Sequence, residues 1–493
     1  MRGIFFEQFL GKSPLWYKCT IIAFLLLNPL LYITAGPFVT GWVVLLEFIF
    51  TLALSLQCYP VPSGGLLALE AIIMGLASPE GVYKEVAANL PTLLLLIFMV
   101  SAIYYLKDVI FVFFTKLFLS IRKKYLLSLA FCMVSAAISA FLDALTIMAV
   151  IVAVCFNFYA IYHKVVAAYE DDPGLAPGTG PGVEAGDIDE FRGFMRNIVM
   201  HGAVGTALGG TMTLVGEPQN LMIGAMMGWS FAEFFIRCSI ISVPVMLVGF
   251  ALCPVLEIVR FPGFGYQLPE RAREIIAKDY ARVAGHLTAR TRLLHLTQIL
   301  VGILLIFALS FHVAEVGLIG VTLIVLLSAF TGKTKEHDLA EAFNHAMPFV
   351  CLIIVFFAIL AVVHEQHLVS PLVQWVFRFE GVQQMLALYF VNGALSCISD
   401  NVFIASLFIG EVEKAYAAGL FSYEWYEKLA VIVNMGTNIP AVATPNGQAA
   451  FLYLLTSALA PLIRLSYLAM VRLALPYTVV MITAGALCTY YLL

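Results

Sequence analysis

Two aspartates offer the clearest chemistry in this sequence. Asp143 in FLDALT and Asp400 in SDNVFIAS each lie inside a long apolar run. An ionised carboxylate near the centre of a bilayer costs about 3 kcal/mol on insertion scales, so such groups are usually paired, hydrated or bound to a cation. These two residues are therefore the first candidates for function.

Each aspartate is followed by a hydrophobic segment that is interrupted by Gly, Pro and amide residues. The first segment, GGTMTLVGEPQNLMIG, covers Gly209 to Gly224, and the second, NMGTNIPAVATPNGQAAF, covers Asn434 to Phe451. A helix that passes Pro218 or Pro445 loses a backbone hydrogen bond and frees carbonyl oxygens, and the half-helix ends supply oriented dipoles. Such oxygens suit a hard cation such as sodium.

We therefore predict two half-sites for sodium and protons, each formed by an aspartate hairpin and a broken helix. The first half-site comprises Asp143 and Thr146 with Thr213, Glu217 and Asn220. The second comprises Ser399, Asp400 and Asn401 with Thr437, Asn438, Thr444 and Asn446. Glu217 could join the site or lock its loop. An inert kink is the alternative for either break alone, but a break at matching places in both halves favours function.

Composition indicates an all-α polytopic membrane protein. The chain has 493 residues, of which 62% are hydrophobic and 12% charged, and the apolar runs recur at membrane-spanning length. The nine cysteines are scattered singly and form no CxxC pair. Nothing supports nucleic-acid binding, and the net charge of -4 says little because the distribution of Lys and Arg among loops matters more.

Hydropathy and loop charge predict about eleven transmembrane helices plus two re-entrant hairpins. Residues 1–60 hold an N-terminal cytoplasmic segment and the first two spans. Residues 61–256 form a first repeat with a hairpin at 125–160 and a broken helix at 198–226. A basic cytoplasmic linker covers 257–295. Residues 296–493 form a second repeat with a hairpin at 384–410 and a broken helix at 428–463.

The two halves share one order of elements, but the first hairpin opens to the inner side of the membrane and the second to the outer side. This is the pattern of an inverted-topology repeat. Basic loops predict a cytoplasmic N-terminus and a periplasmic C-terminus. Two short full spans are the alternative to the first hairpin. Residues 108–120 and the segment PLVQWVFRFEGV are predicted as interfacial helices, and 164–196 as a flexible polar loop. The basic segment RAREIIAKDYARVAGHLTARTRLL is either a membrane-surface helix or a solvated linker helix.

Other polar residues carry weaker predictions. Glu47 and Glu70 lie in apolar helices, and His201 is more typical of a structural histidine than of a pH sensor. HEQH at 364–367 lacks the spacing of an HExxH zinc protease, and there is no GxSxG or P-loop sequence. The chain is therefore not expected to be an enzyme, and its energy source is not ATP.

The motifs FLDALT, GGTMTLVGEPQNLMIG, SDNVFIAS and NIPAVATPNGQAAF together resemble the bacterial NhaB family of sodium/proton antiporters, within the ion transporter superfamily. The resemblance covers essentially the whole chain. The broader superfamily typically carries Ser-Asn-Thr at its hairpin tips, whereas this chain has Leu142-Asp143-Ala144 and Ser399-Asp400-Asn401. Carboxylates at these places can hold either sodium or a proton, which favours cation antiport.

The resemblance implies extrusion of sodium, and also of lithium, from the cytoplasm of a bacterium in exchange for external protons. It further implies location in the inner membrane, a homodimer with a scaffold part and a moving part, and no cofactor. The alternative within the same class is a sodium-coupled symporter of a small anion such as a dicarboxylate. From other classes, a channel and an intramembrane hydrolase remain open.

Overall fold

The computed structural model describes residues 6–54, 57–170, 185–285, 288–311, 313–368, 370–398 and 401–493. Within these ranges six helices are long and apolar enough to cross a membrane, or seven if one bent pair is counted as a single span. The pair is Leu96–Tyr104 and Lys107–Ser120, which meet at 56°. A helical polytopic membrane protein is thus confirmed, whereas eleven spans and the inverted repeat stay predictions.

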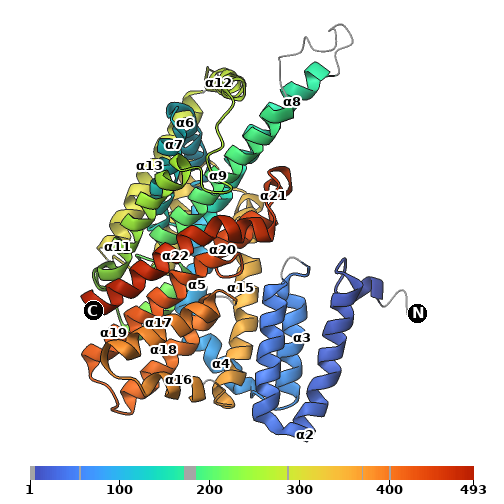
Figure 1. Ribbon diagram of the computed structural model, residues 1–493, viewed down its shortest axis with the longest axis vertical. Helices are drawn as coiled ribbons and strands as arrows, with labels where there is room; N and C mark the ends of the chain where they lie inside the picture. The colour runs from blue at the N-terminus through green and yellow to red at the C-terminus, as the bar shows by residue number, and fades with distance from the viewer. Residues whose placement is uncertain are drawn as a thin grey trace.

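The chain begins with two helical limbs that turn back on each other. Helix α2 (Leu15–Ala53) breaks at Gly36, whose φ of 83° is readily adopted only by glycine, and Pro37 starts the second limb. The two limbs correspond to the first two predicted spans. Figure 1 shows them beside α3 (Pro60–Ile73), at one end of the molecule.

The rest of the first half runs from α4 to α12. Its short helices are α4 (Pro79–Ala88), α5 (Leu90–Tyr104), α6 (Lys107–Ser120) and α7 (Lys124–Ser139). They are followed by α8 (Ala144–Glu170), α9 (Ala185–Gly210), α10 (Pro218–Met227), α11 (Phe231–Ile258) and α12 (Glu270–Gly285). Helices α7 and α8 form the first hairpin, and α9 and α10 flank the first break. Helix α12 is the helix predicted within the basic linker.

The second half follows with α13 to α22. Its first helices are α13 (Ala289–Ser310), α14 (Val316–Thr331), α15 (Glu336–Glu365) and α16 (Ser370–Phe377). The second hairpin is formed by α17 (Gly381–Ser396) and α18 (Asn401–Ala417). The second broken segment comprises α19 (Tyr423–Asn438), the 3-10 turn η1 (Pro440–Ala443), α20 (Ala449–Thr456) and α21 (Leu459–Leu462), before α22 (Tyr467–Leu492).

The structure corrects three helix boundaries. The polar loop predicted at 164–196 is wrong at both ends, because α8 continues to Glu170 and α9 begins at Ala185; residues 171–184 lie outside the described ranges. Helix α15 begins at Glu336, ten residues before its apolar run. Helix ends follow capping and propensity rather than the membrane boundary, so polar turns extend beyond apolar runs.

The two hairpins differ in length. In the second, α17 has 16 residues and α18 has 17, fewer than the roughly 20 that a span requires. In the first, α7 has 16 residues but Ala144–His163 of α8 is long and apolar enough to cross. The two-span alternative therefore stays open for the first hairpin.

The two halves interlock through the helices that follow the breaks. Helix α10, which follows the first break, packs against α18 of the second hairpin. Helix α20, which follows the second break, packs against α8 of the first hairpin. Each half thus supports the hairpin of the other.

Candidate functional site

Asp143 lies in the turn between α7 and α8, one residue before α8 begins. Its Oδ2 accepts hydrogen bonds from the backbone N–H of Thr146 at 3.1 Å and from Thr146 Oγ1 at 3.3 Å. This is the arrangement of a helix N-cap, which explains locally why α8 starts here. The predicted contact between Asp143 and Thr146 is present, with Thr146 donating to the carboxylate.

The Asp143 side chain is half-buried and lines a cavity of about 20 Å³. That volume holds about one water molecule or one small ion. Two of the lining residues are Pro218, which starts α10, and Ala449, which starts α20. The sequence paired Asp143 with the first break only, whereas the structure brings helices from both breaks to it. The other lining residues are Leu96, Val100, Leu145 and Ala346.

A second cavity, of about 510 Å³, adjoins the first because Val100 and Leu145 line both. Thr146 also lines it, together with the charged residues Lys107, Asp108 and Glu341. Three charged side chains thus lie at a cavity that adjoins the one beside Asp143. The sequence placed Asp108 in a predicted interfacial helix, 108–120, and assigned none of these three charges to the site.

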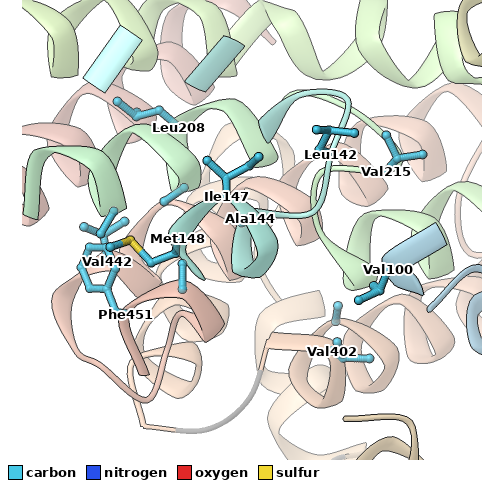
Figure 2. Close-up of a cluster of buried hydrophobic side chains, with 14 of the residues drawn as sticks. Val100, Leu142, Ala144, Ile147, Met148, Leu208, Val215, Val402, Val442 and Phe451 are labelled. Atoms are coloured by element: carbon cyan, nitrogen blue, oxygen red, sulfur yellow. The ribbon is translucent and has the colours of Figure 1, made fainter. Parts of the chain in front are cut away.

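Apolar side chains surround the tip of the first hairpin. Figure 2 shows Leu142 and Ala144 at the tip, with Met148 of α8 facing Val442 of η1 and Phe451 of α20. All five are buried. Water therefore has little access to Asp143 except through the cavities, and charge interactions there are stronger than in water.

Thr213 and Thr444 connect the breaks to the hairpins by equivalent hydrogen bonds, which we call the threonine ties. Thr213 Oγ1 of the first break donates to the carbonyl oxygen of Ala140, the residue that caps α7. Thr444 Oγ1 of the second break donates to the carbonyl oxygen of Cys397, the residue that caps α17. Each bond thus joins a break to the end of the first limb of its own hairpin, three residues before the aspartate.

Side-chain amides connect the two breaks directly. Gln219 Nε2 donates to Asn438 Oδ1 at 2.8 Å, and Asn438 Nδ2 donates to Asn220 Oδ1 at 3.0 Å. Asn438 Nδ2 also lies 2.9 Å from Asn434 Oδ1. All four side chains are buried. We refer to Gln219, Asn220, Asn434 and Asn438 as the amide cluster.

Asn220 also closes the first break. Its Nδ2 lies 2.8 Å from the Gly210 carbonyl oxygen and 2.7 Å from the Thr213 carbonyl oxygen, at the end of α9 and in the break. The sequence predicted that freed backbone carbonyls in the breaks would bind a cation. The carbonyls of Gly210 and Thr213 instead accept hydrogen bonds from the Asn220 amide. The unwound backbone is therefore held rigidly.

The other predicted residues occupy separate places. Thr437 Oγ1 donates to the Val433 and Asn434 carbonyl oxygens of its own helix, and Asn446 Nδ2 donates to the Ala53 carbonyl oxygen of α2 at 3.4 Å. Asn401 is buried at the start of α18. Glu217 is buried at the N-cap of α10. Ser399 and Asp400 lie outside the described residues.

A buried charge network joins α7, α9 and α11 to one another and to α22. Glu257 Oε1 of α11 lies 2.6 Å from Lys124 Nζ of α7 and 2.7 Å from His201 Nε2 of α9. His201 Nδ1 lies 2.8 Å from the Tyr477 hydroxyl of α22. The sequence gave no sign of this network, because its members are far apart along the chain.

The whole chain matches one family model, described as Bacterial Na+/H+ antiporter B (NhaB), over residues 1–493. The chain belongs to the NhaB family. The Na(+)/H(+) antiporter NhaB of Pseudomonas entomophila (strain L48) is 51% identical over 484 residues, which are 98% of this chain and 97% of that protein.

Two further bacterial relatives have the same level of identity. The Na(+)/H(+) antiporter NhaB of Shewanella denitrificans is 50% identical over 482 residues, 97% of this chain and 91% of that protein. The protein of the same name from Citrobacter koseri is 50% identical over 495 residues, 99% of this chain and 95% of that protein. The NhaB resemblance inferred from the motifs is thus confirmed over the full length.

Proposed function

We propose that this chain exchanges sodium for protons across the bacterial inner membrane and thereby extrudes sodium, and lithium, from the cytoplasm. Membership in the NhaB family and full-length relatives named Na(+)/H(+) antiporter NhaB support the exchange. Symport of a small anion with sodium is not supported by these relatives.

Competition at Asp143 couples the two fluxes. A carboxylate binds either sodium or a proton, and protonation removes the charge that holds the cation. The observation that carries this role is the small cavity beside Asp143, which is next to both breaks and to a second cavity lined by charged side chains. Asp400, with Ser399 and Asn401, plays the matching role in the second half. The shared order of hairpin, break and threonine tie supports this assignment.

Alternating access follows if the hairpins and broken segments move together as one elevator-like unit. The amide cluster joins the two breaks, the threonine ties join each break to its hairpin, and α10 and α20 cross to the opposite hairpin. Separation of any one of these elements from the others would leave buried polar groups without partners, which is costly. The remaining helices would then serve as the scaffold of a homodimer.

We assign the topology from loop charge: the N-terminus is cytoplasmic and the C-terminus periplasmic. The domains are residues 1–60, the two inverted repeats 61–256 and 296–493, and the linker 257–295 between them. The repeats are supported by their matching order of elements, with α7 to α10 in one and α17 to α20 in the other.

Sodium-dependent proton movement in inverted membrane vesicles tests the site. We expect Asp143→Asn and Asp400→Asn each to abolish it at equal protein levels, whereas Asp189→Asn should retain it. Asp189 is a matched control because its side chain is 59% exposed on α9. Full activity in either site variant would refute that residue's role. A requirement for an added dicarboxylate would favour the symporter instead.

A further inference from the structure

A second group of acidic residues lies apart from Asp143, between α3 and the two limbs of α2. Asn28 is in the first limb, Glu47 in the second and Glu70 in α3. Asn28 Nδ2 donates to Glu47 Oε2 at 2.8 Å and to Glu70 Oε2 at 2.8 Å. One amide nitrogen therefore bonds both carboxylates. The two bonded oxygens, Glu47 Oε2 and Glu70 Oε2, can be no farther apart than twice 2.8 Å.

This group is enclosed. Asn28 is fully buried and Glu47 is 4% exposed, while Glu70 is half-buried. Among the described residues no Lys, Arg or His forms an ion pair with either glutamate. Two carboxylates this close, in apolar helices, repel each other unless a proton or a cation lies with them.

Two buried oxygens in the group have no hydrogen-bond partner: Asn28 Oδ1 and Glu47 Oε1. Both N–H bonds of the Asn28 amide are already used, so a proton carried by one of the carboxylates, or a bound cation, would have to satisfy these two oxygens. Each buried acceptor that stays unpaired costs about 1–3 kcal/mol. A bound cation would coordinate both oxygens and would also offset the negative charge of the carboxylates.

We propose that Asn28, Glu47 and Glu70 form a second binding site for a monovalent alkali cation, sodium in the cell, which protons displace. The three side chains offer five oxygens, four from carboxylates and one from an amide, which is the ligand type that hard cations prefer. The site lies outside the hairpins and the breaks, and it does not depend on the role of Asp143.

Its position links it to the transport machinery. Phe48, next to Glu47, packs edge-on against Phe356 of α15 and Phe403 of α18. At the end of the same limb, the Ala53 carbonyl oxygen accepts the hydrogen bond from Asn446 of the second break. Occupancy of the site would stiffen the limb that contacts both the second hairpin and the second break.

Equilibrium binding of radioactive sodium to the purified full-length protein tests the proposal, with choline chloride balancing ionic strength. The background is Asp143→Asn/Asp400→Asn, which removes the proposed transport carboxylates. We expect this variant to retain sodium binding that falls as the pH is lowered. Adding Glu47→Gln/Glu70→Gln should weaken the remaining binding at least about tenfold. Adding Glu80→Gln, an exposed residue of α4, should leave it unchanged.

Two results would overturn the site: absence of sodium binding in Asp143→Asn/Asp400→Asn, or binding that is unaffected by the two glutamine substitutions. If the combined variant does not give a folded protein, Glu70→Gln alone serves, because Glu70 is only half-buried, and it must still weaken binding. Failure of the transport assignment would instead appear as antiport that survives Asp143→Asn, so the two proposals fail separately.

Discussion

Asn438 Nδ2 donates a hydrogen bond to Asn220 Oδ1 at 3.0 Å, although the two residues are 218 positions apart in the chain. Asn220 belongs to the first broken segment and Asn438 to the second. The two breaks are therefore in direct contact through buried amides. A displacement of one break relative to the other would disrupt this bond, so the two segments are coupled mechanically.

Removal of the Asn438 amide should uncouple the breaks. In Asn438→Leu, Gln219 Nε2 and Asn220 Oδ1 lose partners in a buried setting, at about 1–3 kcal/mol each. We expect a lower unfolding temperature in detergent and loss of antiport in vesicles. Thr478→Val of α22 is the control, because the buried Thr478 hydroxyl bonds only within its own helix, and it should change little. Equal losses in both variants would contradict the coupling role.

The threonine ties should contribute equally in the two halves. Thr213→Val and Thr444→Val each remove a hydrogen bond to the carbonyl that ends the first limb of a hairpin. A bond worth about 1 kcal/mol corresponds to roughly a fivefold rise in the KM for sodium. Thr213→Ser and Thr444→Ser keep the hydroxyl and should stay close to wild type. Sodium-dependent dequenching of a pH indicator in vesicles measures each KM, and an effect in one half only would argue against matching repeats.

Local patterns in the sequence predicted a turn at Asp143 and interruptions at Pro218 and Pro445, and the structure has all three. Asp143 interrupts a long apolar run, and Pro218 starts α10 within a hydrophobic segment. The second predicted break, at Pro445, lies between η1 and α20. These signals depend on a few adjacent residues, so they can be recognised without the fold.

Contacts between distant segments could not be predicted in this way. The sequence assigned Asn220 and Asn438 to separate half-sites as cation ligands, whereas the structure joins them to each other. It also placed Asp143 with the first break only, while Ala449 from the second lines the same cavity. Which amide meets which partner is decided by helix packing, and hydropathy and charge do not encode that packing residue by residue.

The buried network around Glu257 should be sensitive to loss of a single charge. Lys124→Met removes the lysine that lies 2.6 Å from Glu257 and leaves the carboxylate with less compensation, at a cost of about 3–5 kcal/mol. Lys124→Met/Glu257→Gln removes both charges and should be more stable than the single variant. Lys123→Met, at an exposed neighbouring position, should stay within about 0.5 kcal/mol of wild type. Thermal unfolding in detergent ranks the three variants, and a double variant less stable than Lys124→Met would contradict the charge argument.

Close packing of α7 on α9 should set the position of the first hairpin tip. A Cβ at Gly209 of α9 would overlap the carbonyl oxygen of Ala136, and Ser139 Oγ of α7 donates to the Thr206 carbonyl oxygen at 3.0 Å nearby. Gly209→Ala therefore forces the helices apart, with an overpacking cost of about 1–3 kcal/mol, and displaces the turn that carries Asp143.

We expect Gly209→Ala to lower both the unfolding temperature and the maximal rate of sodium-dependent proton movement. Gly302→Ala is the matched control, because Gly302 lies in helix α13 with open space around the added Cβ. In a helix, alanine is favoured over glycine by roughly 0.5–1 kcal/mol, so this control should be neutral or slightly more stable. If Gly209→Ala behaved like Gly302→Ala, the two helices would not be in the close contact that positions Asp143.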